Sequence, residues 1–598
     1  MTRTAQVVFA AMVLAAFGAF FAAQALKSQP PVIQRFQLAH RVISPNGDGR
    51  FDRQRVTFRL KRHDTVDVAI VDERGDTVRE LASGVELPAG RQLEPGLRWT
   101  GRTDSGHRAR DGIYRVRITL RGEGRTVVVR RSFRVDTTPP RPRIASIGPS
   151  RTPGPELLPN PQGEPARIRL ATPARAGRLL VFRTWPAPGA LVRTTPIPDG
   201  SRVTSWDGTD DSGAPVAQGP YLAVIETRDS AGNVGTSAPL DGRGRPVAEY
   251  GREMPGRGGI TVRRLALQAP LAPVSAGRRA TVAVDSRQRP YHWTLRALGE
   301  ARPERRGRAE RALVHVTPSG TRSAVHLFTA RRDGLEASVP IAVDDREDHR
   351  VLVVLPAMTW QGRNPVDDDG DGLPNLLGAG SDVRLARVFG TPLPPGFAAR
   401  ERGVLEWLAK GRRRFDLTTD VALATGVGPK LEGHRGVLLA GDAVWLPPAL
   451  QRDLRRFVAR GGALVGAGVD SLRRQARLTA SLRLTGPTPA ASADLFGSEL
   501  EPLRRGTFDV VGATDEVELF RYTGGALRGY TQVEATRSTG RAKLVASAVD
   551  DRERPVVVAL RVGRGLVVRF GLPELPSRLA DDPDAQGLME RAWELLSR

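Results

Sequence analysis

The chain contains no cysteine. Disulfide bonds, thiolate metal sites and cysteine nucleophiles are therefore excluded along all 598 residues. Aromatic residues are also scarce, at 5%, whereas glycine and proline number 64 and 46. This composition favours turn-rich β domains over helical arrays, and a chain of this length predicts several domains rather than a single core.

Lysine is also rare. Only five of the 90 basic residues are lysine, so the formal net charge of +25 comes almost entirely from arginine. A basic surface attracts acidic polymers through its summed charge. Acidic cell-envelope polymers or other surface proteins are therefore the predicted partners, and nucleic acid is not. The arginines are scattered along the chain, which agrees equally well with the codon usage of a GC-rich genome.

One long run without charge occupies residues 5–26, after Arg3 and before Lys27. Its length predicts a transmembrane helix that holds a single-pass protein in the cell membrane, with residues 27–598 outside the cytoplasm. The small-x-small sequence "AQA" at 23–25 supports the alternative, a cleaved signal peptide and a secreted chain. Both interpretations place the bulk of the protein in an extracytoplasmic compartment.

The chain repeats itself once at an offset of 107 residues. "WTGRTDSG" at 99–106 recurs as "WDGTDDSG" at 206–213, and "DGIY" at 111–114 recurs as "QGPY" at 218–221. The offset equals the size of an immunoglobulin-like sandwich domain, and alternating segments such as "VTFRL" and "RVRITL" are typical of half-buried strands. The repeated Trp and Tyr are predicted to lie in the cores of two such domains.

The order of the motifs "SPNGDG", "VDERGDTVREL", "WTGRTDSG" and "DGIYRVRITL" resembles the Ig-like domain of flagellar hook-capping proteins of the FlgD type, which bacterial surface proteins reuse widely. The resemblance covers roughly residues 40–245, and the second copy lacks the opening "SPNGDG". It implies a β-sandwich fold and a cell-envelope setting. It implies no enzymatic activity.

The pattern changes at residue 351, where "VLVVLP" is a continuous apolar strand of the kind buried in a parallel sheet. Predicted helices at 396–411 and 447–462 then alternate with predicted strands at 435–442 and 463–468. Alternation of helices with buried strands predicts an α/β domain.

"VLVVLPAMTWQGRNP", followed by "GVLLAGDAVWLPPALQRDLRRFVARGGALVGAGVDSLRR", resembles the C-terminal domain of the N,N-dimethylformamidase beta (large) subunit family, over roughly 260–598. The resemblance implies an amidotransferase-like α/β fold and a relative that hydrolyses amides with iron held by tyrosines and a carboxylate. Here Arg363 stands where that family commonly has tyrosine. Ser471 is the candidate for a serine nucleophile, but no G-x-S-x-G elbow surrounds it. His434 and Asp442 flank the predicted strand 435–442. No catalytic residue is therefore predicted.

The acidic run "VDDDGDGLPN" contains the strongest metal-binding pattern in the sequence. Asp367, Asp369 and Asp371 alternate and precede Gly372, as the ligands of calcium loops do. Position 12 of an EF-hand register is Gly378, so no glutamate closes the loop. A calcium site and a solvated acidic turn both stay open, and calcium is the predicted cofactor if the loop binds one.

A related stretch, "SPNGDGRFD", begins at Ser44 and offers oxygen ligands at Asn46, Asp48 and Asp52. An EF-hand register that starts at Asn46 places Arg50 at position 5, where a ligand is needed. A turn that caps the first strand through its Asx side chains is therefore preferred over a weak cation site.

The predicted architecture is a multidomain chain with an N-terminal transmembrane helix, Ig-like β-sandwich repeats and an amidotransferase-like α/β domain. Its predicted parts are an anchor or signal peptide at 1–26, FlgD-like Ig domains at 40–137 and 141–240, a third β-sandwich at 258–345 and the α/β domain at 346–598. The predicted function is that of a membrane-anchored extracytoplasmic envelope protein with a non-catalytic binding or scaffold role. The alternative is an amidohydrolase that acts on C–N bonds.

Overall fold

The computed structural model describes residues 3–27, 32–93, 96–149, 154–187, 189–247 and 258–598. Strands contain 41% of the residues and helices 13%, so the chain is mostly β. Its described residues divide into two compact units. The first unit comprises the chain up to Pro142 together with 175–177 and 226–236, and the second comprises the rest.

The first element, α1 (Arg3–Lys27), contains the apolar N-terminal run. No helix within the described part of the chain is both long and apolar enough to cross a membrane. The predicted transmembrane helix at 5–26, and the single-pass membrane anchor that it implied, are therefore wrong.

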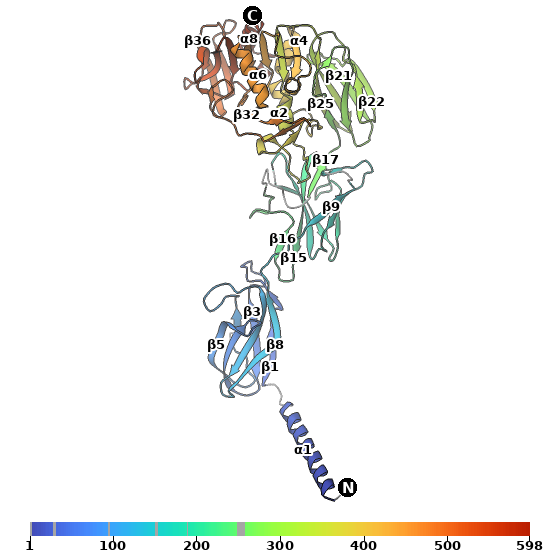
Figure 1. Ribbon diagram of the computed structural model, residues 1–598, viewed down its shortest axis with the longest axis vertical. Coiled ribbons are helices and arrows are strands. Elements are labelled where there is room, and N and C mark those ends of the chain that lie inside the picture. Colours follow the sequence, from blue (N-terminus) through green and yellow to red (C-terminus); the bar gives the residue numbers. More distant parts are fainter. Residues whose placement is uncertain (1–2, 28–31, 94–95, 150–153, 188, 248–257) are drawn as a thin grey trace. The chain divides into compact units, whose positions relative to one another are not determined.

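Two sheets form the first β domain, because its strands alternate apolar and polar residues and can each bury one face (Figure 1). One sheet has the order β1-β3-β6 and the other the order β2-β8-β7-β4-β5. The buried faces meet in a core that contains Trp99, Tyr114 and Phe133. The strands are β1 (Ile33–Leu38), β2 (Val42–Ile43), β3 (Gln54–Leu60), β4 (Asp64–Val71), β5 (Thr77–Leu87), β6 (Leu97–Trp99), β7 (Gly112–Leu120) and β8 (Arg125–Val135).

The second β region has a sheet of order β14-β11-β9 and a sheet of order β10-β17-β15-β12-β13, with β16 paired to β15. Its last strand, β17, lies between β10 and β15 although it follows both in the sequence. The strands are β9 (Ile144–Gly148), β10 (Glu156–Leu158), β11 (Ala166–Leu170), β12 (Gly177–Arg183), β13 (Ala190–Ile197), β14 (Val203–Trp206), β15 (Gly219–Arg228), β16 (Val234–Thr236) and β17 (Gly259–Val262).

The aromatic residues of the repeat have the same contacts in both copies. Trp99 donates its indole N–H to the carbonyl oxygen of Arg102 at 2.7 Å, and Trp206 donates to that of Thr209 at 2.8 Å. Each repeated tyrosine donates its hydroxyl to the carbonyl oxygen four residues earlier, in the manner of the tyrosine corner of Ig domains: Tyr114 and Tyr221, both at 2.7 Å. The predicted core positions of these residues are confirmed, since all four are buried.

A third β region follows, with sheets of order β18-β20-β23 and β19-β25-β24-β21-β22. Its core is continuous with that of the C-terminal region. The strands are β18 (Ala266–Gln268), β19 (Val274–Ser275), β20 (Ala280–Asp285), β21 (Tyr291–Ala297), β22 (Arg305–Ala309), β23 (Leu313–Val316), β24 (Ala324–Arg332) and β25 (Leu335–Asp344).

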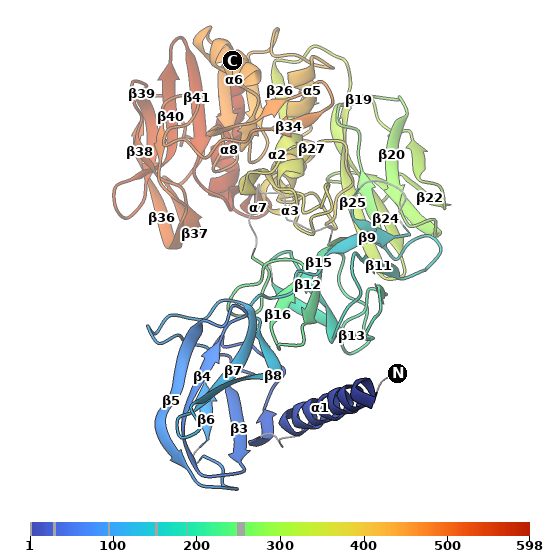
Figure 2. The same ribbon diagram turned by 60° about the horizontal axis from the view of Figure 1, so that its bottom comes forward.

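The C-terminal region is built on a nine-stranded sheet of order β28-β26-β29-β31-β41-β40-β39-β36-β37 (Figure 2). These strands are β26 (Val351–Leu355), β28 (Asp416–Thr419), β29 (Gly436–Leu439), β31 (Ala463–Gly466), β36 (Arg504–Asp515), β37 (Ala526–Val533), β39 (Lys543–Val549), β40 (Pro555–Val562) and β41 (Gly565–Phe570). The smaller strands are β27 (Val383–Arg384), β30 (Trp445–Leu446), β32 (Arg474–Gln475), β33 (Arg477–Leu478), β34 (Arg483–Thr485), β35 (Glu499–Leu500) and β38 (Thr536–Ser538).

Helices cover both faces of the parallel part of this sheet. Along β26, Leu352 and Val354 join one core with Leu454 of α6, whereas Val353 joins the opposite core with Leu588 of α8. The helices are α2 (Ala357–Gly362), α3 (Phe397–Arg400), α4 (Arg402–Lys410), α5 (Asp420–Thr425), α6 (Pro448–Ala459), α7 (Leu575–Arg578), α8 (Pro583–Ser597) and a 3₁₀ turn η1 (Leu377–Ala379).

The fold-class prediction also needs correction in this region. Pairing is parallel from β28 to β41 but antiparallel from β41 through β40, β39 and β36 to β37. An amidotransferase-like α/β domain is therefore too simple a description of 346–598. The antiparallel half arises because tight turns join β39 to β40 and β40 to β41, and two-residue or short turns can connect only antiparallel strands.

Candidate functional site

The acidic loop 366–375 brings its three alternating carboxylates together. Asp367, Asp369 and Asp371 each offer an oxygen, and these oxygens lie within 4.8 Å of one another. Asp367 is buried and accepts the backbone N–H of Gly370 at 2.7 Å and that of Gly372 at 2.9 Å. The loop is thus wrapped around a buried carboxylate.

Burial and mutual repulsion disfavour the ionised form of two of these carboxyls. Burial raises the pKa of Asp367 well above its usual value, and the Asp371 charge raises it further. Burial likewise raises the pKa of Asp371 to about 6, with repulsion from Asp369 adding to the shift. A divalent cation would relieve this repulsion, and oxygen is the ligand that calcium prefers. The calcium site stays a prediction.

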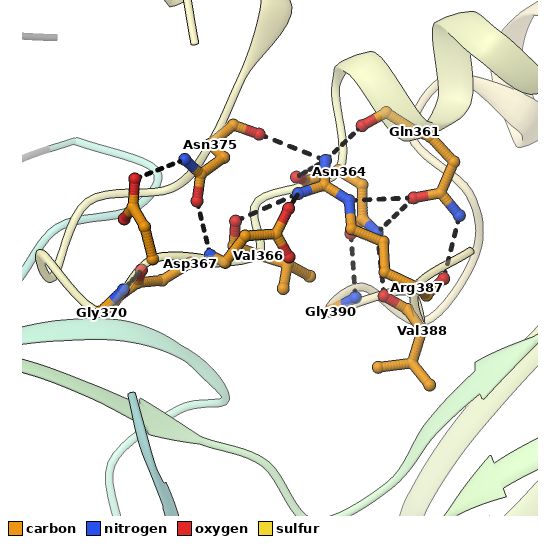
Figure 3. Close-up of polar contacts among 11 residues, drawn as sticks. Gln361, Asn364, Val366, Asp367, Gly370, Asn375, Arg387, Val388 and Gly390 are labelled. Carbon is orange, nitrogen blue, oxygen red and sulfur yellow. Dashed lines mark hydrogen bonds and ion pairs between the residues drawn. The ribbon is translucent and has the colours of Figure 1, made fainter. Parts of the chain in front are cut away.

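A buried arginine fixes the base of the acidic loop (Figure 3). Arg387 pairs with Asp368 at 2.9 Å and donates to the carbonyl oxygens of Gln361, Asn364 and Asn375 at 2.5, 3.1 and 3.2 Å. An arginine with this many acceptors is satisfied despite burial, because its planar fork matches several oxygens at once. Sequence reasoning missed this residue, since no spacing in the sequence links it to the loop.

The acidic loop also contacts the second β region directly. The carbonyl oxygen of Gly370 accepts the backbone N–H of Gly259 in β17 at 3.0 Å, and that of Gly372 accepts the hydroxyl of Thr184 at 2.6 Å. A Cβ built on Gly372 would lie 2.8 Å from Leu222 of β15. The loop is therefore a structural junction as well as a candidate cation site.

The candidate ligands of the "SPNGDGRFD" loop accept hydrogen bonds from the backbone of the loop itself. Asp52 accepts the N–H of Gly47 at 2.8 Å and that of Gly49 at 2.7 Å, while Asp48 accepts that of Arg50 at 2.7 Å. Asn46 accepts the N–H of Asp48 at 2.9 Å. These contacts support the preferred interpretation, a turn stabilised by Asx side chains.

The same loop contacts the loop 229–233 within the first compact unit. The Ser44 hydroxyl lies 2.5 Å from Oδ1 of Asn233, and Asn233 Nδ2 donates to the carbonyl oxygen of Asp136 at 2.8 Å. The ring of Phe51 packs on Gly232, where a Cβ would lie 3.1 Å from the ring. The opening motif therefore packs on the loop 229–233 within this unit.

A second candidate site lies at the carboxyl ends of the parallel strands, where open α/β sheets usually bind their ligands. Asp442 follows β29 and is buried, with Oδ2 2.8 Å from Nη1 of Arg363 and 3.8 Å from Nε of Arg400. Its Oδ1 accepts the N–H of Val469 at 3.0 Å. The carboxylate is thus neutralised by two cations rather than left free.

Glu401 lies beside Asp442 and is 1% exposed. Burial raises its pKa to about 8, and the charge of Asp442 contributes. Its Oε2 has no hydrogen-bond partner among the described residues, and its carboxyl group occupies the space where Gly441 would carry a Cβ. At neutral pH this group is a buried acid that can donate a proton. Its sequence context, "ARERG", matches no motif and does not indicate a buried acid.

The structure does not assemble a serine-type triad. His434 lies before β29 and pairs with Asp416 at 2.7 Å, whereas Asp442 lies beyond the opposite end of that strand. Ser471 accepts the N–H of Ala443 at 3.0 Å and is buried. A strand of four residues spans roughly 13 Å, so the histidine cannot reach the serine.

An iron site of the kind that the dimethylformamidase resemblance implies does not fit these residues. Asp442 is already paired with two arginines. Two tyrosines of this half have other partners: Tyr291 donates to the carbonyl oxygen of Arg311, and Tyr522 donates to Glu594. The ring of Tyr530 lies under Arg578, and its buried hydroxyl has no hydrogen-bond partner among the described residues. The carboxylate of Asp442 is thus held by two cations and two of the three tyrosines have other partners, so these residues do not supply the ligand set that the resemblance implies.

No protein-family model matches the sequence, and no curated protein matches it. Solved structures similar to parts of the chain include the exo-β-1,4-mannosidase Op5Man5 from Opitutaceae bacterium strain TAV5, with 17% identity, a TM-score of 0.25 and coverage of 42% of this chain and 36% of that one. A β-galactosidase from Bacillus circulans sp. alkalophilus has 17% identity, a TM-score of 0.26 and coverage of 41% and 31%. The chain thus spans about a third of these proteins, and such slight similarity carries no argument.

Proposed function

We propose that this chain is an extracytoplasmic cell-envelope protein that binds or scaffolds and does not catalyse. The single observation that carries the proposal is the pairing of Asp442 with Arg363 and Arg400 at the carboxyl edge of the parallel strands. A carboxylate so neutralised is a poor metal ligand and a poor general base. The absence of cysteine excludes a cysteine nucleophile.

The sequence supports the envelope setting. The apolar run, with "AQA" near its end at 23–25, fits a cleaved export signal, and the resemblance of 40–245 to FlgD-type Ig-like domains fits a surface protein. Acidic envelope polymers are the proposed partners, because the net charge of +25 favours them.

An assay of amide hydrolysis tests the proposal. The purified chain, supplied with Fe²⁺, should not hydrolyse N,N-dimethylformamide above the rate of a protein-free control, and Arg363→Tyr alone should not create activity. Turnover by the unaltered chain that disappears when iron is removed would overturn the proposal.

One observation favours the alternative, an amidohydrolase. Glu401 is a buried carboxyl whose pKa of about 8 suits a general acid at neutral pH, and such groups cluster at active sites. If this alternative holds, a screen of small amides should show hydrolysis that Glu401→Gln abolishes and that Glu406→Gln, in the helix that follows Glu401, leaves unchanged.

A further inference from the structure

A basic cleft of about 740 Å³ opens at the amino ends of the parallel strands. Its walls come from the loop before β29, from α6 and from the turn between β40 and β41. Its volume lies within the range of small-ligand sites. This edge of the sheet is opposite to the one that carries Asp442 and Glu401, so the cleft is separate from the candidate site described above.

Positive charge dominates the cleft. Five cations line it against two carboxylates, Glu432 and Asp453, and Asp453 pairs with Arg456. Among the residues that the structure describes, no ion pair involves the other four cations, all of them exposed: Lys430, Arg435, Arg460 and Arg564. Four unpaired cations around one concavity raise the local potential and attract an anion.

The positive charge of the cleft is stabilised in part by groups other than carboxylates. Arg456 and Arg460 lie at the carboxyl end of α6, where the helix dipole stabilises positive charge. His434 forms part of the floor; its Nε2 pairs with Asp416, and its buried Nδ1 has no hydrogen-bond partner among the described residues. The cleft is therefore lined by exposed cations together with a buried imidazole.

The chemistry of the lining favours a phosphate polymer without bases. Arginine guanidinium groups match phosphate oxygens in pairs, so several arginines suit successive phosphates. Single-stranded nucleic acid would also favour free aromatic faces for stacking. Phe457 is the aromatic side chain in the lining, and its ring is packed on Gly462, where a Cβ would lie 2.4 Å from the ring.

We infer that the basic cleft binds a polyanion of phosphate diesters or linked phosphates, such as a polyol-phosphate polymer of the cell envelope. This inference rests on the proposed function, because it names the partner class of that binding role. The cations at 430, 435, 460 and 564 hold the phosphates, and no bond is made or broken.

Fluorescein-labelled polyphosphate tests the inference by anisotropy with the full chain. We expect saturable binding that weakens as salt rises. Arg435→Gln with Arg564→Gln should raise Kd at least about tenfold, and Lys430→Gln with Arg460→Gln should act likewise, because each pair removes two charge-assisted contacts. The matched control, Arg505→Gln with Arg541→Gln, removes the same charge from exposed arginines outside the cleft and should leave Kd within about twofold.

Equal Kd values for the cleft and control variants would overturn the inference. Tighter binding of single-stranded DNA than of polyphosphate would identify a nucleic-acid site, and equally tight binding of poly-glutamate would show attraction by charge without preference for phosphate; either result also overturns it. The amide-hydrolysis assay is scored separately, so loss of this inference leaves the non-catalytic proposal standing.

Discussion

At the scale of single residues, the ionisation of Glu401 links stability to pH. Its pKa is about 8 in the folded chain and about 4.5 when unfolded, so between these values the folded state holds a proton that the unfolded state releases. The free energy of unfolding should therefore fall as pH rises from about 4.5 to about 8. The stability associated with this group is fully present below about 4.5.

Glu401→Gln should remove most of this fall, by on the order of a few kcal/mol, because the amide resembles the neutral acid and cannot ionise. Urea denaturation at several pH values between 5 and 8 measures it. Glu406→Gln, in the helix α4 that Glu401 precedes and paired with Arg402 near the surface, is the control and should keep the parent slope. Parallel slopes for Glu401→Gln and the parent would show that the carboxyl is ionised in the folded state.

Sequence patterns reveal residues that act through spacing and miss residues that act through burial. The alternation of Asp367, Asp369 and Asp371 predicted that their oxygens gather, because a loop of this spacing turns alternate side chains inward. Glu401 and Arg387 gave no such signal. Each owes its character to neighbours distant in the sequence, Asp442 for the first and the carbonyl groups of the acidic loop for the second.

At the scale of elements, Gly372 tests the junction between the acidic loop and β15. Its φ of +85° already favours glycine, and a Cβ there would lie 2.8 Å from a methyl group of Leu222. Gly380 is the matched control, with φ of +87° and nothing within 4 Å of a Cβ. Both substitutions by alanine should cost about 1 kcal/mol of backbone strain.

Gly372→Ala should cost a further 1–3 kcal/mol, roughly, because overpacking displaces Leu222. Chemical denaturation of the two variants measures the difference. Equal losses for Gly372→Ala and Gly380→Ala would mean that the loop does not pack on β15 in solution.

Calcium gives the acidic loop a second test. If the loop binds the ion, calcium at about 100 times its Kd should stabilise the chain by about 2.7 kcal/mol and raise Tm. Asp369→Asn with Asp371→Asn should abolish the gain, whereas Glu499→Gln, an exposed charge elsewhere, should preserve it. A gain of the same size in all three proteins would place the ion outside this loop, and no gain in the parent would leave a solvated acidic turn.

Elements with a clear period were predictable, and irregular ones were not. The continuous apolar segment at 351–355 and the amphipathic α6 follow directly from their residues. The long strand β36 escaped prediction because charged and glycine residues interrupt it and its ladder has register shifts. A strand held by irregular pairing lacks the strict alternation that a sequence pattern requires.

At the scale of the whole molecule, separate cores predict separate unfolding transitions. The core of the first β domain and the core shared by the third β region and the C-terminal region have no residue in common. Calorimetry should therefore show more than one transition. Leu60→Ala, which removes a fully buried side chain, should destabilise the first unit by roughly 2–5 kcal/mol and lower its transition alone.

Leu295→Ala is the matched substitution in the other core and should lower a different transition. Thermograms of the two variants identify which unit melts where. A single transition that both substitutions shift equally would show that the units unfold together.

The 107-residue repeat and the change of pattern at 351 could be found in the sequence, because both are properties of long stretches. Two larger features could not be predicted correctly from the sequence. The membrane anchor was inferred from one apolar run at 5–26 and is wrong, and the mixed pairing of the nine-stranded sheet depends on contacts between distant strands. The residues of a single strand do not specify which other strands it pairs with.

The position of β17 has a consequence for synthesis. The ribosome makes β10 and β15 first, yet these strands pair with β17 rather than with each other. Until residue 262 has emerged, the middle of this sheet is missing, and two strand edges stay open to pairing with another chain. A nascent chain that stalls or is cut before that residue would expose both edges, so the vulnerable stage in the life of this protein comes before its third β region is made.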